Sequence, residues 1–220
     1  MLTEAAPLTR RNTGAAEQAL RHAGIAWGRK RWGNVRVIHE LAIQDRRADL
    51  VFVGLSDLYA VEIKGPADKM DGRLTEQLRT YGAWCPEVWL LAHPKWLGHA
   101  EVKGVRNLLL PGADGILIAN AKNQLLPQKF EPTRDDLVCS RLLEVLWQGE
   151  AHEIADRTGV IPGAALSRLH TRKVKAMLAR MLTGHEIMKQ VCRCLRARPS
   201  HMTGAGSDPP IFDDALGPLI

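Results

Sequence analysis

Residues 47–64, RADLVFVGLSDLYAVEIK, constrain the fold of this chain more than any other segment. Apolar, β-branched and aromatic residues dominate both halves, and residues 54–57 supply a turn, so the segment predicts a β-hairpin. With the turn centred between residues 55 and 56, the numbers of paired residues sum to about 111, which puts Asp49 opposite Glu62. Side chains alternate along a strand, so Lys64 shares a face with Glu62. The hairpin therefore predicts two carboxylates and an ammonium group at one place on a sheet.

The neighbours of these charges are too apolar for a strand with one face in water. Two carboxylates close together in a buried sheet repel each other unless a cation neutralises them. Mg²⁺ is suited to this, because it binds through one or two carboxylates and keeps several waters. A metal site and a structural ion-pair cluster are both consistent with the residues alone.

Asp49 followed by Glu62-Ile63-Lys64 resembles the signature of the PD-(D/E)XK nuclease superfamily. Glu40 stands where many members place another acidic ligand, and residues 77–81, QLRTY, look like the QxxxY helix motif of the RecB-like branch. The resemblance spans roughly residues 13–120, with one departure, Ala48 where the family has proline. The whole chain also looks similar to a poorly characterised bacterial and phage family of that superfamily that has a helical C-terminal extension.

The resemblance implies a metal-dependent deoxyribonuclease in DNA repair, recombination, or the processing of phage or mobile elements. Asp49, Glu62 and the Ile63 carbonyl would hold Mg²⁺ or Mn²⁺. Lys64 would orient the attacking water or stabilise the transition state, and Glu40 would hold a second metal or polarise a water. The alternatives are a DNA-binding adaptor, or a nuclease subunit that is active only within a larger recombination or transposition complex. Glu17, on an expected first helix, is a competing upstream acid.

Residues 73–84 predict a helix after the hairpin, with Arg73, Gln77 and Tyr81 on one face. An ordinary solvated face explains that pattern as well. The functional interpretation has Arg73 and Gln77 contact phosphate, while Tyr81 hydrogen-bonds the site or stacks near a base.

The order of elements predicts an α/β fold, specifically a restriction-endonuclease-like mixed sheet flanked by helices, over residues 1–125. Strands are expected at 35–43, 87–93 and 115–119 besides the hairpin, and helices at 15–22 and 96–109. Residues 27–33, WGRKRWG, read as a basic, aromatic loop that either contacts single-stranded DNA or caps the core.

From residue 133 the pattern is helical, and residues 133–198 are expected to form a basic extension. Residues 151–160 resemble the first helix and turn of a helix-turn-helix, with 167–182 as the recognition helix; simple packing onto the core is the alternative. Residues 168–198 contain nine Lys or Arg and one acid, Glu186, which favours contact with DNA. We expect Arg172, Lys173 and Lys175 to bind it. Residues 199–220 read as a disordered tail.

The remaining expectations concern partners and compartment. The chain has no run of eighteen apolar residues, so no membrane partner is expected. Its four cysteines are poorly spaced for a disulfide framework, which indicates a reducing cytoplasm. A homodimer or a larger DNA-processing complex is a further expectation.

Overall fold

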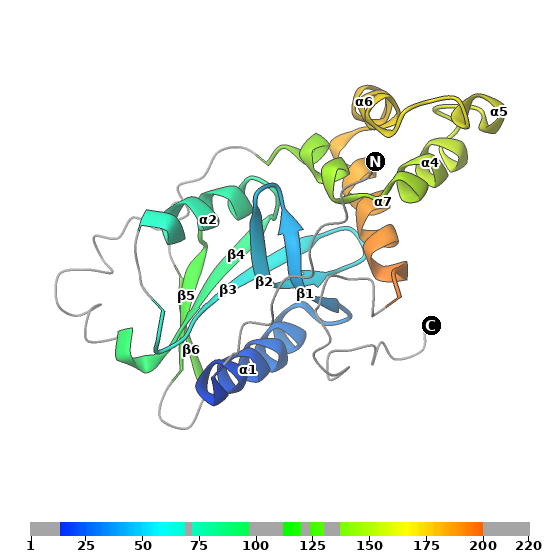
Figure 1. The fold of residues 1–220 in the computed structure, drawn as a ribbon. Coiled ribbons are helices and arrows are strands. Elements are labelled where there is room, and N and C mark those ends of the chain that lie inside the picture. The colour runs from blue at the N-terminus through cyan, green and yellow to red at the C-terminus, as the bar shows by residue number, and fades with distance from the viewer. Residues whose placement is uncertain (1–13, 69–71, 97–111, 120–123, 130–136, 200–220) are drawn as a thin grey trace.

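A computed structural model describes residues 14–68, 72–96, 112–119, 124–129 and 137–199. Six strands form one sheet whose spatial order follows the chain (Figure 1). They are β1 (Arg36–Ile43), β2 (Arg46–Val53), β3 (Leu58–Lys64), β4 (Glu87–Ala92), β5 (Gly115–Ala119) and β6 (Leu125–Lys129). β3, β4 and β5 run parallel, and the other neighbours pair antiparallel. The predicted α/β class with a mixed sheet is confirmed; β6 was not predicted.

Strands β1 to β5 are largely buried, between helix α1 (Ala15–Trp32) and helix α2 (Gly72–Gly82) (Figure 1), whereas β6 is mostly exposed. Leu50, Phe52 and Val61 point into one apolar cluster with α1. Val51 and Ala60 point into the other, which α2 and the C-terminal helices complete. Two-sided burial explains why the strands read as nearly continuous apolar runs. The restriction-endonuclease-like arrangement in particular stays a prediction.

Helix α1 is longer than its sequence pattern suggested, because two glycines interrupt the pattern without ending the helix. Gly24 and Gly28 lie on its buried face. A Cβ atom at Gly28 would lie 2.3 Å from the Phe52 ring, so only glycine allows the backbone this close to the sheet. The loop predicted for residues 27–33 is therefore wrong. Trp27 and Trp32 pack against the apolar cluster beneath α1, which supports the core-capping alternative.

The hairpin register predicted from the sequence is confirmed over its regular part. Leu50 pairs with Val61 and Val53 with Leu58, so paired numbers sum to 111. The described pairing of β2 with β3 ends at Leu50–Val61. Beyond this pair a side chain takes over from the backbone in joining the two strands: the Asp49 Oδ2 atom accepts a hydrogen bond from the Ile63 N–H at 2.7 Å.

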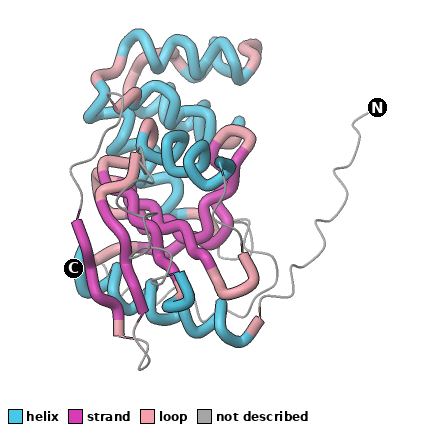
Figure 2. The backbone as a smooth tube through the Cα atoms, turned by 90° about the vertical axis from the view of Figure 1, so that its left-hand side faces the viewer, coloured by secondary structure: helices cyan, strands magenta, loops and turns pink. Residues whose placement is uncertain are grey.

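After the sheet the described chain is helical, as predicted. It contains the 3₁₀ helix η2 (Cys139–Val145), then α4 (Gln148–Arg157), α5 (Gly163–Leu166), α6 (Thr171–Met181) and α7 (Gly184–Ala197). These helices gather at one end of the sheet, as the turned view shows (Figure 2). The helix predicted over 167–182 begins only at Thr171, where the His170 side chain accepts a hydrogen bond from the Arg172 N–H. The four-residue α5 precedes it.

The C-terminal helices are joined to the sheet by arginines. Arg36, at the start of β1, donates through Nη1 to the carbonyls of Leu195 and Arg196 at 3.1 and 2.8 Å, and also to that of Arg198. In return, Arg196 donates to the Val53 carbonyl at 2.9 Å. The end of α7 is thus tied to the β1–β2 edge of the sheet.

Some expectations fall outside the described residues, namely most of the helix predicted at 96–109 and nearly all of the tail at 199–220. Pro94–Trp96 form a short 3₁₀ helix. All four cysteines are free thiols. Among the described helices none has the length and apolar character needed to cross a membrane.

Candidate functional site

The β1–β2 pair loses its regular alternation at Glu40 and Asp49. His39 pairs with Leu50 and Leu41 with Ala48, so Glu40 and Asp49 lie between two ordinary pairs. Glu40 has φ of 54°, a left-handed conformation that non-glycine residues rarely adopt within a strand. Such backbone strain occurs mostly at functional sites, where surrounding structure must maintain it.

Arg21 of α1 provides the positive charge at this irregularity. Its Nη2 atom lies 3.6 Å from Glu17 Oε1, 3.4 Å from Glu40 Oε1 and 3.6 Å from Asp49 Oδ1. Its Nη1 atom also donates to the Asp49 carbonyl at 3.0 Å. Arg21 is 7% exposed, so its charge is buried among the carboxylates that neutralise it. Burial and Asp49 raise the pKa of Glu40, and Arg21 opposes that rise.

Glu62 is the most deeply buried carboxylate of the site. It is 2% exposed, and burial followed by the neighbouring Asp49 charge raises its pKa to about 8. Its Oε1 atom accepts a hydrogen bond from Lys64 Nζ at 2.7 Å, while its Oε2 atom is buried without a hydrogen-bond partner. A buried carboxylate oxygen without a hydrogen-bond partner is costly, and this oxygen can still accept a ligand.

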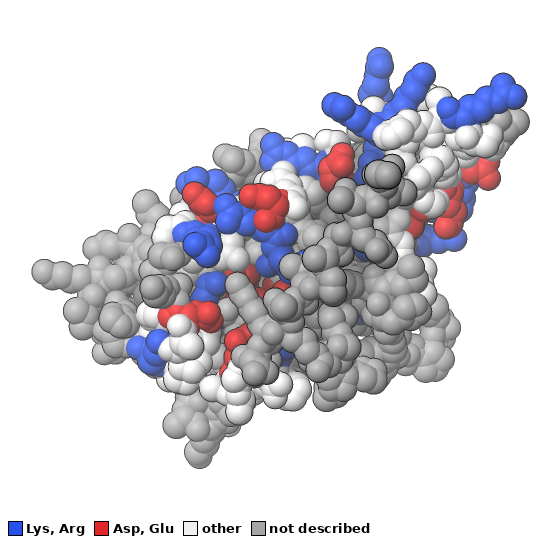
Figure 3. Space-filling view, in the orientation of Figure 1, with Lys and Arg blue, Asp and Glu red and all other residues white. Residues whose placement is uncertain are grey.

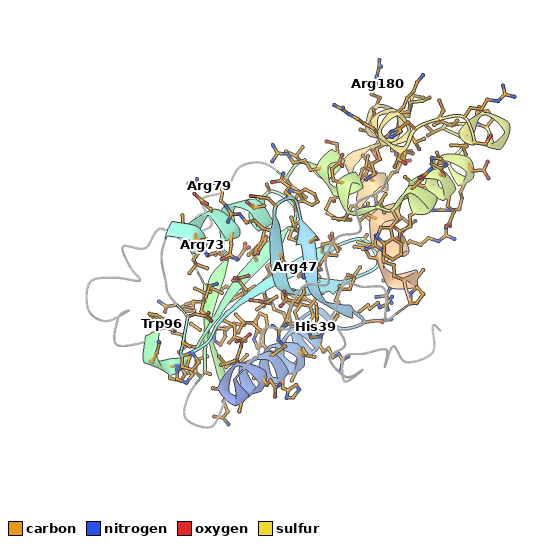
Figure 4. The ribbon with its side chains drawn as sticks, viewed as in Figure 1. His39, Arg47, Arg73, Arg79, Trp96 and Arg180 are labelled. Atoms are coloured by element: carbon orange, nitrogen blue, oxygen red, sulfur yellow. The ribbon has the colours of Figure 1, made fainter. Side chains whose placement is uncertain are left out.

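Helix α2 places two of the predicted residues against this carboxylate. Gln77 Oε1 lies 3.4 Å from Lys64 Nζ, so Gln77 helps to position the lysine. Tyr81 is fully buried, and its hydroxyl donates to the Arg47 carbonyl at 2.7 Å. Burial and the Glu62 charge raise the Tyr81 pKa. Tyr81 therefore supports the site from behind and has no surface on which a base stacks, whereas Arg73 is exposed on α2 (Figure 4).

His39 completes the polar layer beneath Glu40. It is buried, and its Nδ1 atom lies 3.2 Å from Arg21 Nη1. Burial and then the Arg21 charge lower its pKa to about 3, so the imidazole is neutral at physiological pH.

As a metal centre the site is only partly formed. Within the described ranges, no group of three or more His, Cys, Asp or Glu residues is arranged to hold a metal ion. Glu17, Glu40 and Asp49 surround Arg21, and Ile63 contributes its N–H to Asp49. The residues that fit a cation are Asp49 and Glu62, since Mg²⁺ needs only one or two carboxylates besides water.

Sequence reasoning missed Arg21, the residue that brings the carboxylates together. One signal was available: Glu17 and Arg21 are four residues apart on a helix, a spacing that pairs side chains. Glu17, considered only as an alternative to Glu40, lies in the same cluster as Glu40. The two acids are thus not competing assignments, since Arg21 contacts both.

A second feature lies on α6, where exposed basic residues face away from the core. Arg172, Lys173 and Arg180 are exposed on the side opposite Val174 and Leu178, which are fully buried. Lys and Arg side chains cover this part of the surface in Figure 3, and Arg180 points outward in Figure 4. Lys175 differs, because its ammonium lies 3.7 Å from Glu144 Oε2. Arg196 and Arg198 of the predicted cluster instead make internal contacts.

Comparison with known proteins changes the interpretation of the carboxylates. A family model described as Bacteriophage P4 protein cII matches residues 10–203, and no nuclease family is detected. The assignment to the PD-(D/E)XK superfamily is therefore wrong. The function taken from that assignment, DNA hydrolysis, is wrong too, and so are its alternatives, an adaptor or a nuclease subunit of a larger complex. The expected link to phage is confirmed.

Enzymatic activity and the Mg²⁺ or Mn²⁺ cofactor stay predictions.

Neither the curated proteins nor the solved structures include a match to the chain. The family model covers most of the sequence, from ahead of α1 to just past α7. The chain belongs to the Bacteriophage P4 protein cII family.

Proposed function

We propose that this protein binds DNA through the basic face of α6. The observation that carries the proposal is the grouping of Arg172, Lys173 and Arg180 on one exposed side of the helix. No other described residue forms an ion pair with these three, so their charges are available to phosphates. Ala176 and Ala179 lie on the same exposed side, and their small side chains allow close approach of a phosphate backbone.

Several neighbouring basic residues are excluded from this role by their contacts. Lys175, Arg193 and Arg198 lie beside Glu144, Glu153 and Glu150, respectively. The basic surface that is free to contact DNA is therefore smaller than the nine basic residues of 168–198 suggested.

The test compares two triple variants with the same loss of charge. R172A/K173A/R180A removes the α6 face, and K30A/R157A/R193A removes three exposed cations elsewhere. Binding to duplex DNA is measured by fluorescence anisotropy at several salt concentrations. The α6 variant should bind more weakly, and its slope of log K against log salt should shrink by about 0.9 for each phosphate that the variant no longer neutralises. Equal affinities and slopes in the two variants would refute the proposal.

A second proposal concerns the carboxylates. We propose that Asp49 and Glu62 bind a divalent cation such as Mg²⁺, supported by the unpartnered Oε2 atom of buried Glu62. Mn²⁺ binding followed by electron paramagnetic resonance tests this with wild type and E62Q, and E76Q serves as an exposed control. Binding should be lost in E62Q only. Equal binding by E62Q and wild type would exclude the site.

A further inference from the structure

A cleft of about 540 Å³ lies where the sheet meets the C-terminal helices. One side is formed by the β1–β2 hairpin, including Glu40, Gln44 and Arg47. The other side comes from the end of η2 and the residues that lead into α4, including Glu144 and Trp147. Its volume lies in the range of small-molecule sites. No role described so far accounts for it.

Trp147 gives the cleft an aromatic surface that is held in place. The residue is 40% exposed, although tryptophan is usually well buried. The Arg198 guanidinium lies 4.1 Å from the centre of the ring and so supports it by a cation–π contact. Arg198 in turn donates to both carboxylate oxygens of Glu150, at 2.7 and 2.6 Å. The ring is therefore preorganised for stacking, because its support is a buried, paired arginine.

The cleft also has polar groups of different kinds. Arg47 is exposed beside the hairpin and forms no ion pair with another described residue (Figure 4). Trp84 also lines the cleft, and its Nε1–H is buried without a hydrogen-bond acceptor. Glu40 and Glu144 contribute carboxylates, which accept hydrogen bonds from amines and hydroxyls. A ligand that suits all of them has an aromatic ring, one anionic group, and donors and acceptors on its polar edges.

We infer that this cleft binds a single nucleotide unit, with the base stacked on Trp147 and the phosphate at Arg47. One phosphate suits the cleft better than a row of them, because Arg47 is the one exposed cation among the described residues that line it. Stacking on an aromatic side chain accepts any base, since every base has a π face. The inference extends the proposed DNA binding but uses none of the α6 residues.

The experiment measures quenching of 2-aminopurine fluorescence when the probe stacks on the protein. Three probes are compared: the 2-aminopurine deoxynucleoside, its 5′-monophosphate, and a trinucleotide with the probe in the centre. W147L should weaken binding about tenfold or more, and W147F should restore part of the loss. W96L is the matched control, because Trp96 is a partly exposed tryptophan outside the cleft. Circular dichroism establishes that each variant is folded.

The variant R47Q distinguishes the contribution of the phosphate to binding from that of the base. It should weaken binding of the monophosphate and leave binding of the nucleoside unchanged. Tight binding of the monophosphate indicates a free nucleotide as ligand, and binding of the trinucleotide alone indicates a strand; both support the site. Equal quenching by W147L, W96L and wild type would overturn it. The α6 variant R172A/K173A/R180A should quench the probe as strongly as wild type. The proposal for α6 is tested by a different measurement, binding to duplex DNA, so the two proposals can fail independently.

Discussion

The guanidinium of Arg21 makes two contacts with Asp49. Its Nη2 atom lies 3.6 Å from the carboxylate Oδ1 atom, and its Nη1 atom donates to the backbone carbonyl at 3.0 Å. The two residues are 28 positions apart and belong to α1 and β2. The contact lies where the pairing of β2 with β3 ends. Arg21 thus takes the place that a bound cation would have among Glu17, Glu40 and Asp49, and the fold does not need a metal to neutralise them.

Replacing Arg21 by Gln should destabilise the protein by about 1–3 kcal/mol, because it leaves three partly buried carboxylates without their cation. Urea unfolding measures the loss, and K30Q, with the same charge change on an exposed part of α1, should have almost no effect. Added Mg²⁺ should raise the melting temperature of R21Q more than that of wild type. If R21Q and K30Q unfold at the same urea concentration, Arg21 does not have this role.

The free energy of unfolding should fall as the pH rises through the neutral range. Folding raises the pKa of Glu62 from 4.5 to about 8, so between these values the folded protein binds a proton that the unfolded chain has released. The free energy of unfolding should therefore fall by about 1.4 kcal/mol per pH unit from pH 6.5 until the pH approaches 8. E62Q should remove that slope, whatever its effect on stability at one pH.

His39 acts in the opposite direction at lower pH. Its pKa falls from 6.5 to about 3 on folding, so stability is lost as the pH falls below 6.5. For this reason the change in the free energy of unfolding with pH that is due to Glu62 is best measured between pH 6.5 and 8. A slope there that is equal in wild type and E62Q would mean that Glu62 is ionised in the folded protein.

Gly28→Ala should destabilise the protein by about 1–3 kcal/mol, because its Cβ would lie 2.3 Å from the Phe52 ring. Gly149→Ala is the matched control: it lies in α4 with nothing within 4 Å of the added Cβ. Alanine there should stabilise the helix by up to about 1 kcal/mol. Thermal unfolding measures both, and a G28A protein as stable as wild type would contradict the close approach of α1 to the sheet.

Arg36→Met should loosen α7, since the carbonyls of Leu195, Arg196 and Arg198 lose their donor. We expect faster amide hydrogen exchange in α7 and a loss of roughly 1–3 kcal/mol in stability. K189M, an exposed change on the same helix, should leave exchange unchanged. Equal protection of α7 in both variants would show that other contacts hold the helix.

The parts of the fold that depend on residues close together in the sequence could be predicted from the sequence. The hairpin register follows from one short turn and local pairing, and it is correct from Leu50 to Val61. The length of α1 could not be predicted, because Gly24 and Gly28 look like interruptions until their close contact with the sheet is known. The short strand β6 has an exposed, weakly apolar sequence, which gives little periodicity.

The site could be predicted only in part. Asp49, Glu62 and Lys64 were identified because they lie on neighbouring strands. Arg21 was missed because its contact with Asp49 spans 28 residues, and its one local signal, the spacing from Glu17, does not point to the strands. The family was misassigned because a few acidic and basic residues in the expected order are a weak signal, whereas the match over residues 10–203 uses nearly the whole chain.

The contact between Arg36 and the end of α7 has a consequence for the order of folding. Arg36 lies 159 residues before Leu195, so the β1–β2 edge cannot be completed until nearly all of the described chain has been synthesised. A contact of such high sequence separation forms late, since the entropy of closing the loop must be offset first. During translation the contacts between Arg36 and α7 are therefore missing until the last described helix has been synthesised, and until then β1 is held by its pairing with β2.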